Sequence, residues 1–396
     1  MNRRQFLRGS AGLAAAATLP LRRAHGAGPS RLLVLWNAGG WDPSFVFDPH
    51  FESDSFARDE ASSQASSGGI TYANAATRPS VRSYFERYGG RTAVLNGLSV
   101  GSISHEGCTR LVLCGARKEG EPDVATRIAA SLGSALPLPH LVLSGPRYPG
   151  SLGGAQVPLS AALADALADG TTAAEARAQT FLATAATGGG DQRAAYAAAL
   201  DKLPGLMSAL GSLSVPEDPT PDRLIELGLA ALQANLCCAA TLDLGKPNQT
   251  TWDSHYNNNE HQDRAFEYAF DRLLTVVDAL SEATADGGGS LLDETLVLML
   301  SEMGRCPAYN AADGKDHWPY TSALLVGAGV SGGAVLGATD TALVGQPINL
   351  STGARDDAGE RVTTAHLLAG VLERFGLDPE DAFPGVTPFS APFADG

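Results

Sequence analysis

Glu302, Arg305, Asp316 and His317 occur together in the largely apolar passage SEMGRCPAYNAADGKDHWPYTSALLVG at residues 301–327. Carboxylates and imidazoles are common ligands of divalent metals, and a guanidinium can hold a phosphate or sulfate through two parallel hydrogen bonds. The alternative is a buried ion pair between Glu302 and Arg305 beside a core histidine. The passage therefore predicts one side of a metal and anion site, with that structural interpretation as its rival.

The segment TWDSHYNNNEHQ (251–262) places Asp253 and His255 two positions apart. On a loop or an extended segment, side chains at this spacing can face one point. A carboxylate with an imidazole suits zinc, iron or manganese. A surface loop carrying an ion pair explains the same residues, and the sequence leaves both interpretations open.

Two further segments place polar groups where a strand is expected to end. In NAGGWD (37–42) the two glycines let the backbone approach a ligand, and Asp42 supplies a hard oxygen, although the segment taken alone favours a turn-capping role for Asp42. In GSISHEGCTRLVLCG (101–115) either Ser104 or His105 begins a helix, whose free N–H groups favour an anion. A plain N-cap is the alternative for Ser104.

The elements that must position these groups alternate along the chain. Continuous apolar runs predict a buried strand that begins at residue 31. They predict further buried strands over 91–100, 138–145, 294–302, 321–330 and 333–340. Helical spacing predicts helices over 105–116, 261–290 and 361–379. This alternation indicates an α/β fold, a three-layer α/β/α sandwich with a mainly parallel sheet. Ligands in such folds gather at the carboxyl ends of the strands.

Composition excludes several classes of protein. The 396 residues are 44% hydrophobic and 18% charged, so a packed core is expected. The net charge of −15 argues against nucleic acid or an anionic membrane surface as a partner. After the N-terminal segment no apolar run is long enough for a transmembrane helix.

The five cysteines include no C-x-x-C pair. A zinc ribbon is therefore unsupported. We expect Cys237 and Cys238 to be buried in a helical stretch, and a bridge between Cys108 and Cys114 is left open.

The N-terminus reads as an export signal. Arg3 and Arg4 precede a short, alanine-rich apolar stretch and a small-residue cleavage site, the pattern of a twin-arginine signal over residues 1–26. The expected location is periplasmic or extracellular. We expect residues 27–396 to form one domain, with a mostly helical insertion around 158–243.

Taken together, LLVLWNAGGWD, LNGLSVGSISHEGCTRLVLCG, TWDSHYNNNEHQ and the passage that begins SEMGRCPAYNAADGKDHWP resemble an exported bacterial family, domain of unknown function 1501. That family is similar to the alkaline-phosphatase-like and sulfatase-like superfamily. The resemblance implies an alkaline-phosphatase-like fold and a metal-dependent hydrolase of phosphate or sulfate esters.

The resemblance also implies roles for individual residues. It implies a divalent metal, zinc, calcium or manganese, and a small anionic ester as substrate. Ser104 or His105 would lie at the reacting position, and Arg305 would hold the anion. The expected metal ligands are Asp42, Asp253, His255, Glu302, Asp316 and His317.

Two departures from the family pattern shape these expectations. Met303 stands where a second metal's histidine is expected, which favours one metal site over two. The position expected for the nucleophile, ten residues before Gly115, holds His105 rather than a Ser, Thr or Cys. The alternative function is therefore a non-catalytic binding or assembly factor that keeps the fold without a working nucleophile.

Overall fold

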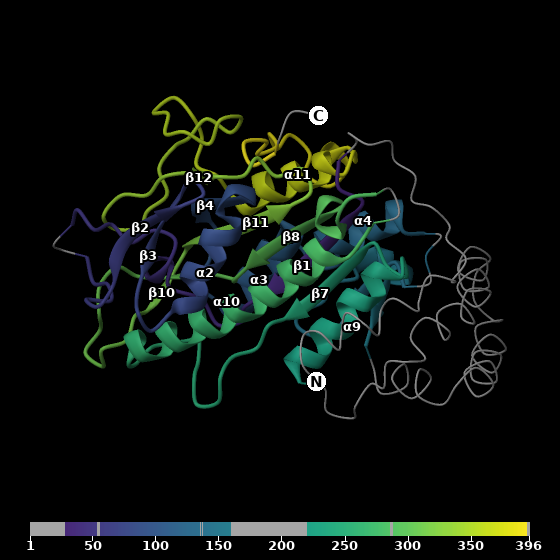
Figure 1. Ribbon diagram of the computed structural model, residues 1–396. Coiled ribbons are helices and arrows are strands. Elements are labelled where there is room, and N and C mark those ends of the chain that lie inside the picture. The colour runs from purple at the N-terminus through teal and green to yellow at the C-terminus, as the bar shows by residue number, and fades with distance from the viewer. Residues whose placement is uncertain are drawn as a thin grey trace.

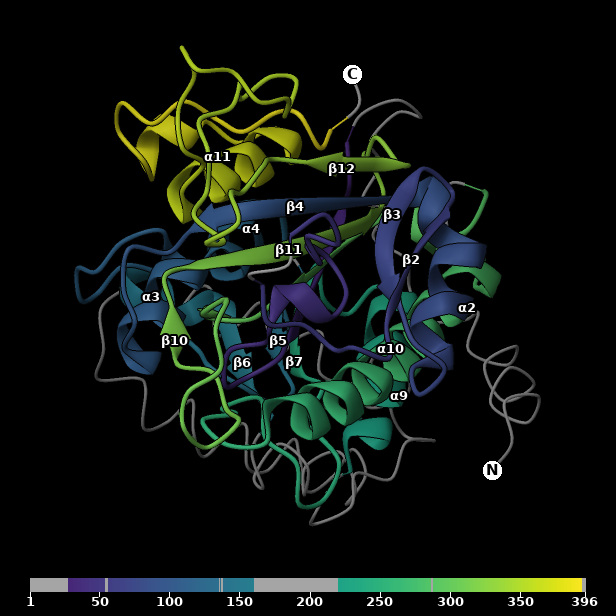
Figure 2. The same ribbon diagram turned by 90° about the vertical axis from the view of Figure 1, so that its left-hand side faces the viewer.

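The computed structural model describes the chain over residues 28–53, 56–134, 136, 138–159, 220–285 and 288–393. Its centre is an eight-stranded sheet with the order β12-β4-β11-β8-β1-β7-β5-β6 (Figures 1 and 2). The strands are β1 (Arg31–Trp36), β4 (Thr92–Ser99), β5 (His140–Val142), β6 (Gln156–Pro158), β7 (Ala239–Asp243), β8 (Thr295–Leu300), β11 (Tyr320–Gly327) and β12 (Ala334–Leu336).

The sheet is parallel except at β11. That strand runs antiparallel to both of its neighbours, β4 and β8, while every other neighbouring pair is parallel. The predicted mainly parallel sheet is therefore confirmed. The reversal of β11 brings the start of this strand, rather than its end, to the edge where the parallel strands finish.

Helices cover both faces of the sheet (Figure 2). Along β1, Leu33 and Leu35 pack with one set of helices, and Leu32 and Val34 pack with the other. This alternation follows from the two-residue period of a strand and confirms the three-layer α/β/α architecture. The first set is α2 (Pro79–Tyr88), α9 (Pro221–Gln233) and α10 (Asn258–Glu282), and the second is α3 (His105–Cys114), α4 (Val124–Leu132) and α11 (Thr364–Arg374).

Local sequence signals account for the helices nearest the site. Helix α3 begins after the N-cap Ser104, whose side chain accepts from the backbone of Gly107, and ends at Gly115 with φ 69°. Helix α10 buries the face predicted from the sequence. That face comprises Phe266, Phe270, Leu273, Leu274, Val277 and Leu280.

The structure corrects the expectation of a helix at Cys237 and Cys238. Cys237 and Cys238 do not lie in a helix, because they lead into β7, which pairs with β1 and β5 inside the sheet. A run of small apolar residues fits a helix by composition, but burial on both faces selects a strand here. Before α2, β2 (Ser63–Ser67) and β3 (Ile70–Asn74) form an antiparallel pair.

Other expectations concern the termini, the insertion and the cysteines. Residues 160–219 of the predicted helical insertion and the predicted signal over 1–26 lie outside the described residues. Cys108 and Cys114 are both buried as free thiols, so the bridge left open by the sequence is not formed. Among the described helices, none is long and apolar enough to cross a membrane.

Candidate metal centre

The candidate site lies at the edge of the sheet where the parallel strands end. Strand β4 leads there through residues 100–104 into α3, and β7 leads there through the loop 244–257 into α10. Just before β11, the short strand β10 (His317–Trp318) pairs antiparallel with β9 (Gly304–Arg305). Three segments that are far apart in the sequence therefore meet at one edge.

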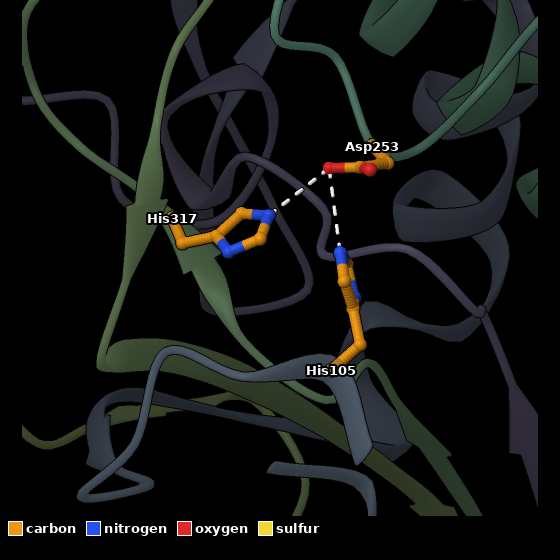
Figure 3. Close-up of side chains that lie close together, drawn as sticks. All are labelled: His105, Asp253 and His317. Carbon is orange, nitrogen blue, oxygen red and sulfur yellow. Dashed lines mark hydrogen bonds and ion pairs between the residues drawn. The ribbon is translucent and has the colours of Figure 1, made fainter. Parts of the chain in front are cut away.

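His105, Asp253 and His317 form the centre of the site. Their ligand atoms all lie within 4.8 Å of one another. The Oδ1 atom of Asp253 is 3.1 Å from His317 Nε2 and 3.5 Å from His105 Nε2, and Figure 3 shows both rings directed at this carboxylate. The side chains are 38%, 40% and 20% exposed, in the order named, so small molecules can reach them.

The far side of each of these two rings is held by an acceptor. Nδ1 of His105 lies 2.8 Å from Glu302 Oε1, and Nδ1 of His317 lies 2.7 Å from the carbonyl oxygen of Ile103. Because neither acceptor can donate, both Nδ1 atoms must carry the proton. A neutral ring then directs the lone pair of Nε2 into the site.

His255 approaches the same point from the loop that carries Asp253. Its Nε2 lies 3.2 Å from Asp253 Oδ1 and 2.9 Å from His317 Nε2. Its Nδ1 lies 3.1 Å from Asp316 Oδ1, and this hydrogen bond lowers the pKa of Asp316. The ring of His255 is thus oriented by an acceptor in the same way as His105 and His317.

Arg305 fixes the carboxylate of Asp253. Its Nη2 atom donates to Asp253 Oδ1 at 2.7 Å, while Nε donates to the carbonyl of Gly40 and Nη2 also to that of Gly39. Burial raises the pKa of Asp253, but the hydrogen bond from Arg305 and the charge of its guanidinium lower the pKa to about 2. Asp253 is therefore ionised at neutral pH.

These donors fit a transition metal. Lone pairs of imidazole nitrogens that converge on an ionised carboxylate repel one another unless a cation lies among them. His105 Nε2 is buried and makes no hydrogen bond within the described part of the chain, as expected of an atom reserved for such a cation. Tetrahedral zinc, with bonds of about 2.0–2.1 Å, spaces its ligand atoms roughly 3.4 Å apart, close to the separations of Asp253 Oδ1 from the three Nε2 atoms.

Asp42 does not join this cluster. Its side chain is fully buried, and its carboxylate accepts from Ser44, Asn258 and the ammonium of Lys315. The role of metal ligand expected from the sequence is therefore not supported by its position. The carboxylate after the first strand is instead neutralised by a lysine that the sequence reasoning passed over.

Other predicted residues also lie in positions that differ from their expected roles. Glu302 and Asp316 stand behind His105 and His255 as hydrogen-bond acceptors, on the far side of the rings from Asp253. Arg305 is fully buried and donates to acceptors within the chain from Nε, Nη1 and Nη2, which does not support its expected hold on an anion. Ser104 accepts from Gly107 N at 3.3 Å as the cap of α3.

Sequence reasoning missed the position of His105 within the ligand cluster. The sequence analysis considered His105 because it holds the position expected for the nucleophile. It did not include His105 among the expected metal ligands. The usable signal was the presence of both His105 and Glu302. A histidine at the start of a helix and a carboxylate after another strand of the same sheet can form a carboxylate–histidine pair facing a metal.

The fold and this cluster define the class of the molecule as an α/β protein with a candidate metal centre. Residues 222–389 match the family described as "Protein of unknown function (DUF1501)", which confirms the resemblance seen in the sequence over that part of the chain. Residues 1–20 match a twin-arginine translocation signal, so the protein is exported by that route to the periplasm or beyond.

Two further comparisons complete these findings. A solved structure, titled as a protein in the alkaline phosphatase superfamily from Vibrio parahaemolyticus, is similar at 10% identity with a TM-score of 0.40. The alignment covers 100% of this chain and 80% of that one. No curated protein matches the chain.

Proposed function

We propose that the protein binds one divalent transition metal through His105, Asp253 and His317 and uses it to hydrolyse phosphate or sulfate esters. The observation that carries this proposal is the convergence of the histidine Nε2 atoms on Asp253 Oδ1, with each Nδ1 held by an acceptor. The imidazole-rich donor set favours zinc or manganese over calcium, which prefers oxygen ligands.

The residues of the site have distinct roles in this proposal. Asp253, held by Arg305, supplies the negative charge that a cation needs, and Glu302 keeps the Nε2 of His105 facing inward. The metal, when bound, would polarise an ester oxygen and increase the acidity of a water molecule. The partial exposure of His105 and Asp253 leaves room for a small anionic ester to approach.

Metal analysis of the purified mature protein tests the first half of the proposal. We expect about one equivalent of zinc or manganese, retained after gel filtration and lost in His317→Ala. The exposed Arg264→Ala variant, on α10, is a suitable control and should retain the metal. A wild-type protein that takes up no divalent metal from either salt would refute the site.

Turnover tests the second half. Aryl phosphates and aryl sulfates should be hydrolysed by the metal-loaded protein, and activity should disappear in His317→Ala. If Ser104→Ala keeps the activity, water rather than the serine is the attacking group. Loss of activity in Ser104→Ala with the metal retained would instead identify Ser104 as the nucleophile.

His255 favours a second candidate function, a binding protein without catalysis. Its Nε2 lies close enough to Asp253 to act as a fourth protein ligand. Four protein ligands close a tetrahedral zinc shell, whereas catalytic sites usually keep a position open. One equivalent of metal with no turnover on either ester class, in wild type and in His255→Ala, would support this candidate.

A further inference from the structure

A network of fully buried polar side chains lies beside the metal centre. It contains one ion pair and four neutral groups, none of them exposed to solvent. Burying charges and hydrogen-bonding groups carries a large desolvation penalty, so such a network needs complete pairing. Its members are Asp42, Ser44, Ser254, Asn258, Gln262 and Lys315, which we call the Asp42 network.

The ammonium of Lys315 is fully paired. Its Nζ donates to Asp42 Oδ2 at 2.8 Å, to the carbonyl of Ala57 at 2.6 Å and to Ser44 Oγ at 3.3 Å. Three acceptors match the three protons of an ammonium. The side chain therefore fastens its own segment to the loops that follow β1.

The backbone of Lys315 reaches the metal ligands directly. Its N–H donates at 3.0 Å to the carbonyl of Ser254, the residue between Asp253 and His255. Its own carbonyl accepts from Nη1 of Arg305, which holds Asp253 through Nη2. Lys315 also precedes His317 by two positions, so it is linked to both loops that supply ligands.

Side chains of α10 complete the connection. Asn258 donates to Asp42 Oδ2 at 3.0 Å and accepts from Ser254 Oγ at 2.7 Å. Gln262 donates to Ser254 Oγ at 2.9 Å and accepts from the N–H of Asp42 at 2.8 Å. Asn258 and Gln262 therefore join the loop after β1 to the loop that carries Asp253.

We propose that the Asp42–Lys315 ion pair is a positioning device that holds the loops of Asp253 and His317 in metal-binding register. This inference rests on the proposed metal centre. Neither residue touches the ligand atoms in the contacts described above, so both act through Ser254, Arg305 and the backbone. The pair would set metal affinity and coordination geometry without supplying a ligand.

The test is the Lys315→Met variant, which keeps most of the length of the side chain and removes its charge. We expect its zinc affinity, measured by chelator competition, to fall about 10- to 100-fold, the range typical for groups that orient metal ligands. The visible spectrum of the cobalt-substituted variant should also change, because the coordination geometry is altered.

Arg31→Met is the matched control. Arg31 is also buried and paired with a carboxylate, Glu294, but it lies at the start of β1, on the opposite edge of the sheet. This variant should lose stability while keeping the zinc affinity and the cobalt spectrum of the wild type. An equal fall in affinity in both variants would overturn the inference, because general destabilisation would then explain it.

The double variant Asp42→Asn/Lys315→Met decides the matter if Lys315→Met fails to fold. Removing both charges avoids leaving a carboxylate buried without a partner. Weakened zinc binding in the folded double variant supports the inference, and wild-type affinity in either variant overturns it while leaving the metal centre intact. A wild-type protein without zinc affinity overturns both proposals.

Discussion

The orientation of His105 depends on a single carboxylate. Glu302 is almost completely buried and accepts from the His105 ring, from Gly39 N at 2.7 Å and from Ser301 Oγ at 3.2 Å. The hydrogen bond to Glu302 raises the pKa of His105. Asp316, which faces His255, is 66% exposed, so its side chain is held less firmly than the buried side chain of Glu302.

This difference predicts unequal effects of two conservative substitutions. Glu302→Gln should weaken zinc binding about 10- to 100-fold, because the ring of His105 loses its charged partner in a buried place. Asp316→Asn should change the affinity by less than about threefold, since exposed partners contribute little. Chelator competition measures both, and equal losses would contradict the assignment of His105 as the better-held ligand.

Gly39 sets the distance between the loop after β1 and Asp253. Its φ is 126°, and an added Cβ would lie 2.8 Å from Trp252 Cβ and 2.9 Å from Asp253 N. Gly39→Ala should therefore cost both folding stability, by roughly 1–3 kcal/mol for the strained backbone, and zinc affinity. Urea unfolding and chelator competition measure the two effects.

The Gly385→Ala variant is a control that introduces backbone strain without a steric clash. Its φ is 71°, but an added Cβ meets nothing within 4 Å. It should lose stability through backbone strain alone, with zinc affinity unchanged. If Gly39→Ala behaves like Gly385→Ala in both measurements, Gly39 does not control the position of Asp253.

At the scale of elements, helices with strong local signals were the most predictable. The N-cap Ser104, the terminal Gly115 and the apolar face of α10 identified these elements from sequence. Strand β7 was not predicted, because its small apolar residues favour no single state until β1 and β5 pack on either side. The site was predicted only in part, again because long-range contacts decide it. Lys315 gains its role only through contacts with residues distant in the sequence.

His140 joins three elements of the sheet and its cover. The ring lies 2.9 Å from Thr126 Oγ1 on α4 and 2.8 Å from Thr241 Oγ1 on β7, while the residue itself begins β5. Burial lowers the pKa of His140 below its ordinary value of 6.5. The unfolded chain therefore takes up this proton more readily than the folded chain.

The consequence is a loss of stability in acid. Because the folded-state pKa is lowered, the contribution of His140 is complete above the unfolded value of 6.5 and falls as the pH drops below it. The slope from this one group approaches about 1.4 kcal/mol per pH unit. In His140→Gln, urea unfolding between pH 7 and pH 5 should show a shallower dependence than wild type, and an unchanged slope would contradict the prediction.

At the scale of the whole molecule, the cysteines are unusual for an exported protein. Cys108, Cys114, Cys237 and Cys238 are buried free thiols, and Cys306 is partly exposed. Burial raises the pKa of Cys114 and of Cys238 to about 12, so these groups stay protonated and unreactive. Burial in the core, rather than disulfide formation, therefore protects these four thiols from oxidation in an oxidising compartment.

Thiol counting tests this arrangement. A chromogenic disulfide reagent should modify one thiol, Cys306, in the native protein and five after denaturation. Reductant should leave the Tm unchanged, because no disulfide contributes to stability. Fewer than five thiols in the denatured, unreduced protein would reveal a bridge and contradict the prediction.

The three proposed ligands come from three segments that only the finished sheet brings together. An unfolded chain cannot offer them to a metal at the same time, so metal uptake must follow folding. The twin-arginine route exports proteins that have already folded, which places folding, and with it the first opportunity for uptake, in the cytoplasm. The identity of the bound ion would then be decided by the metals available in the cytoplasm rather than by those outside.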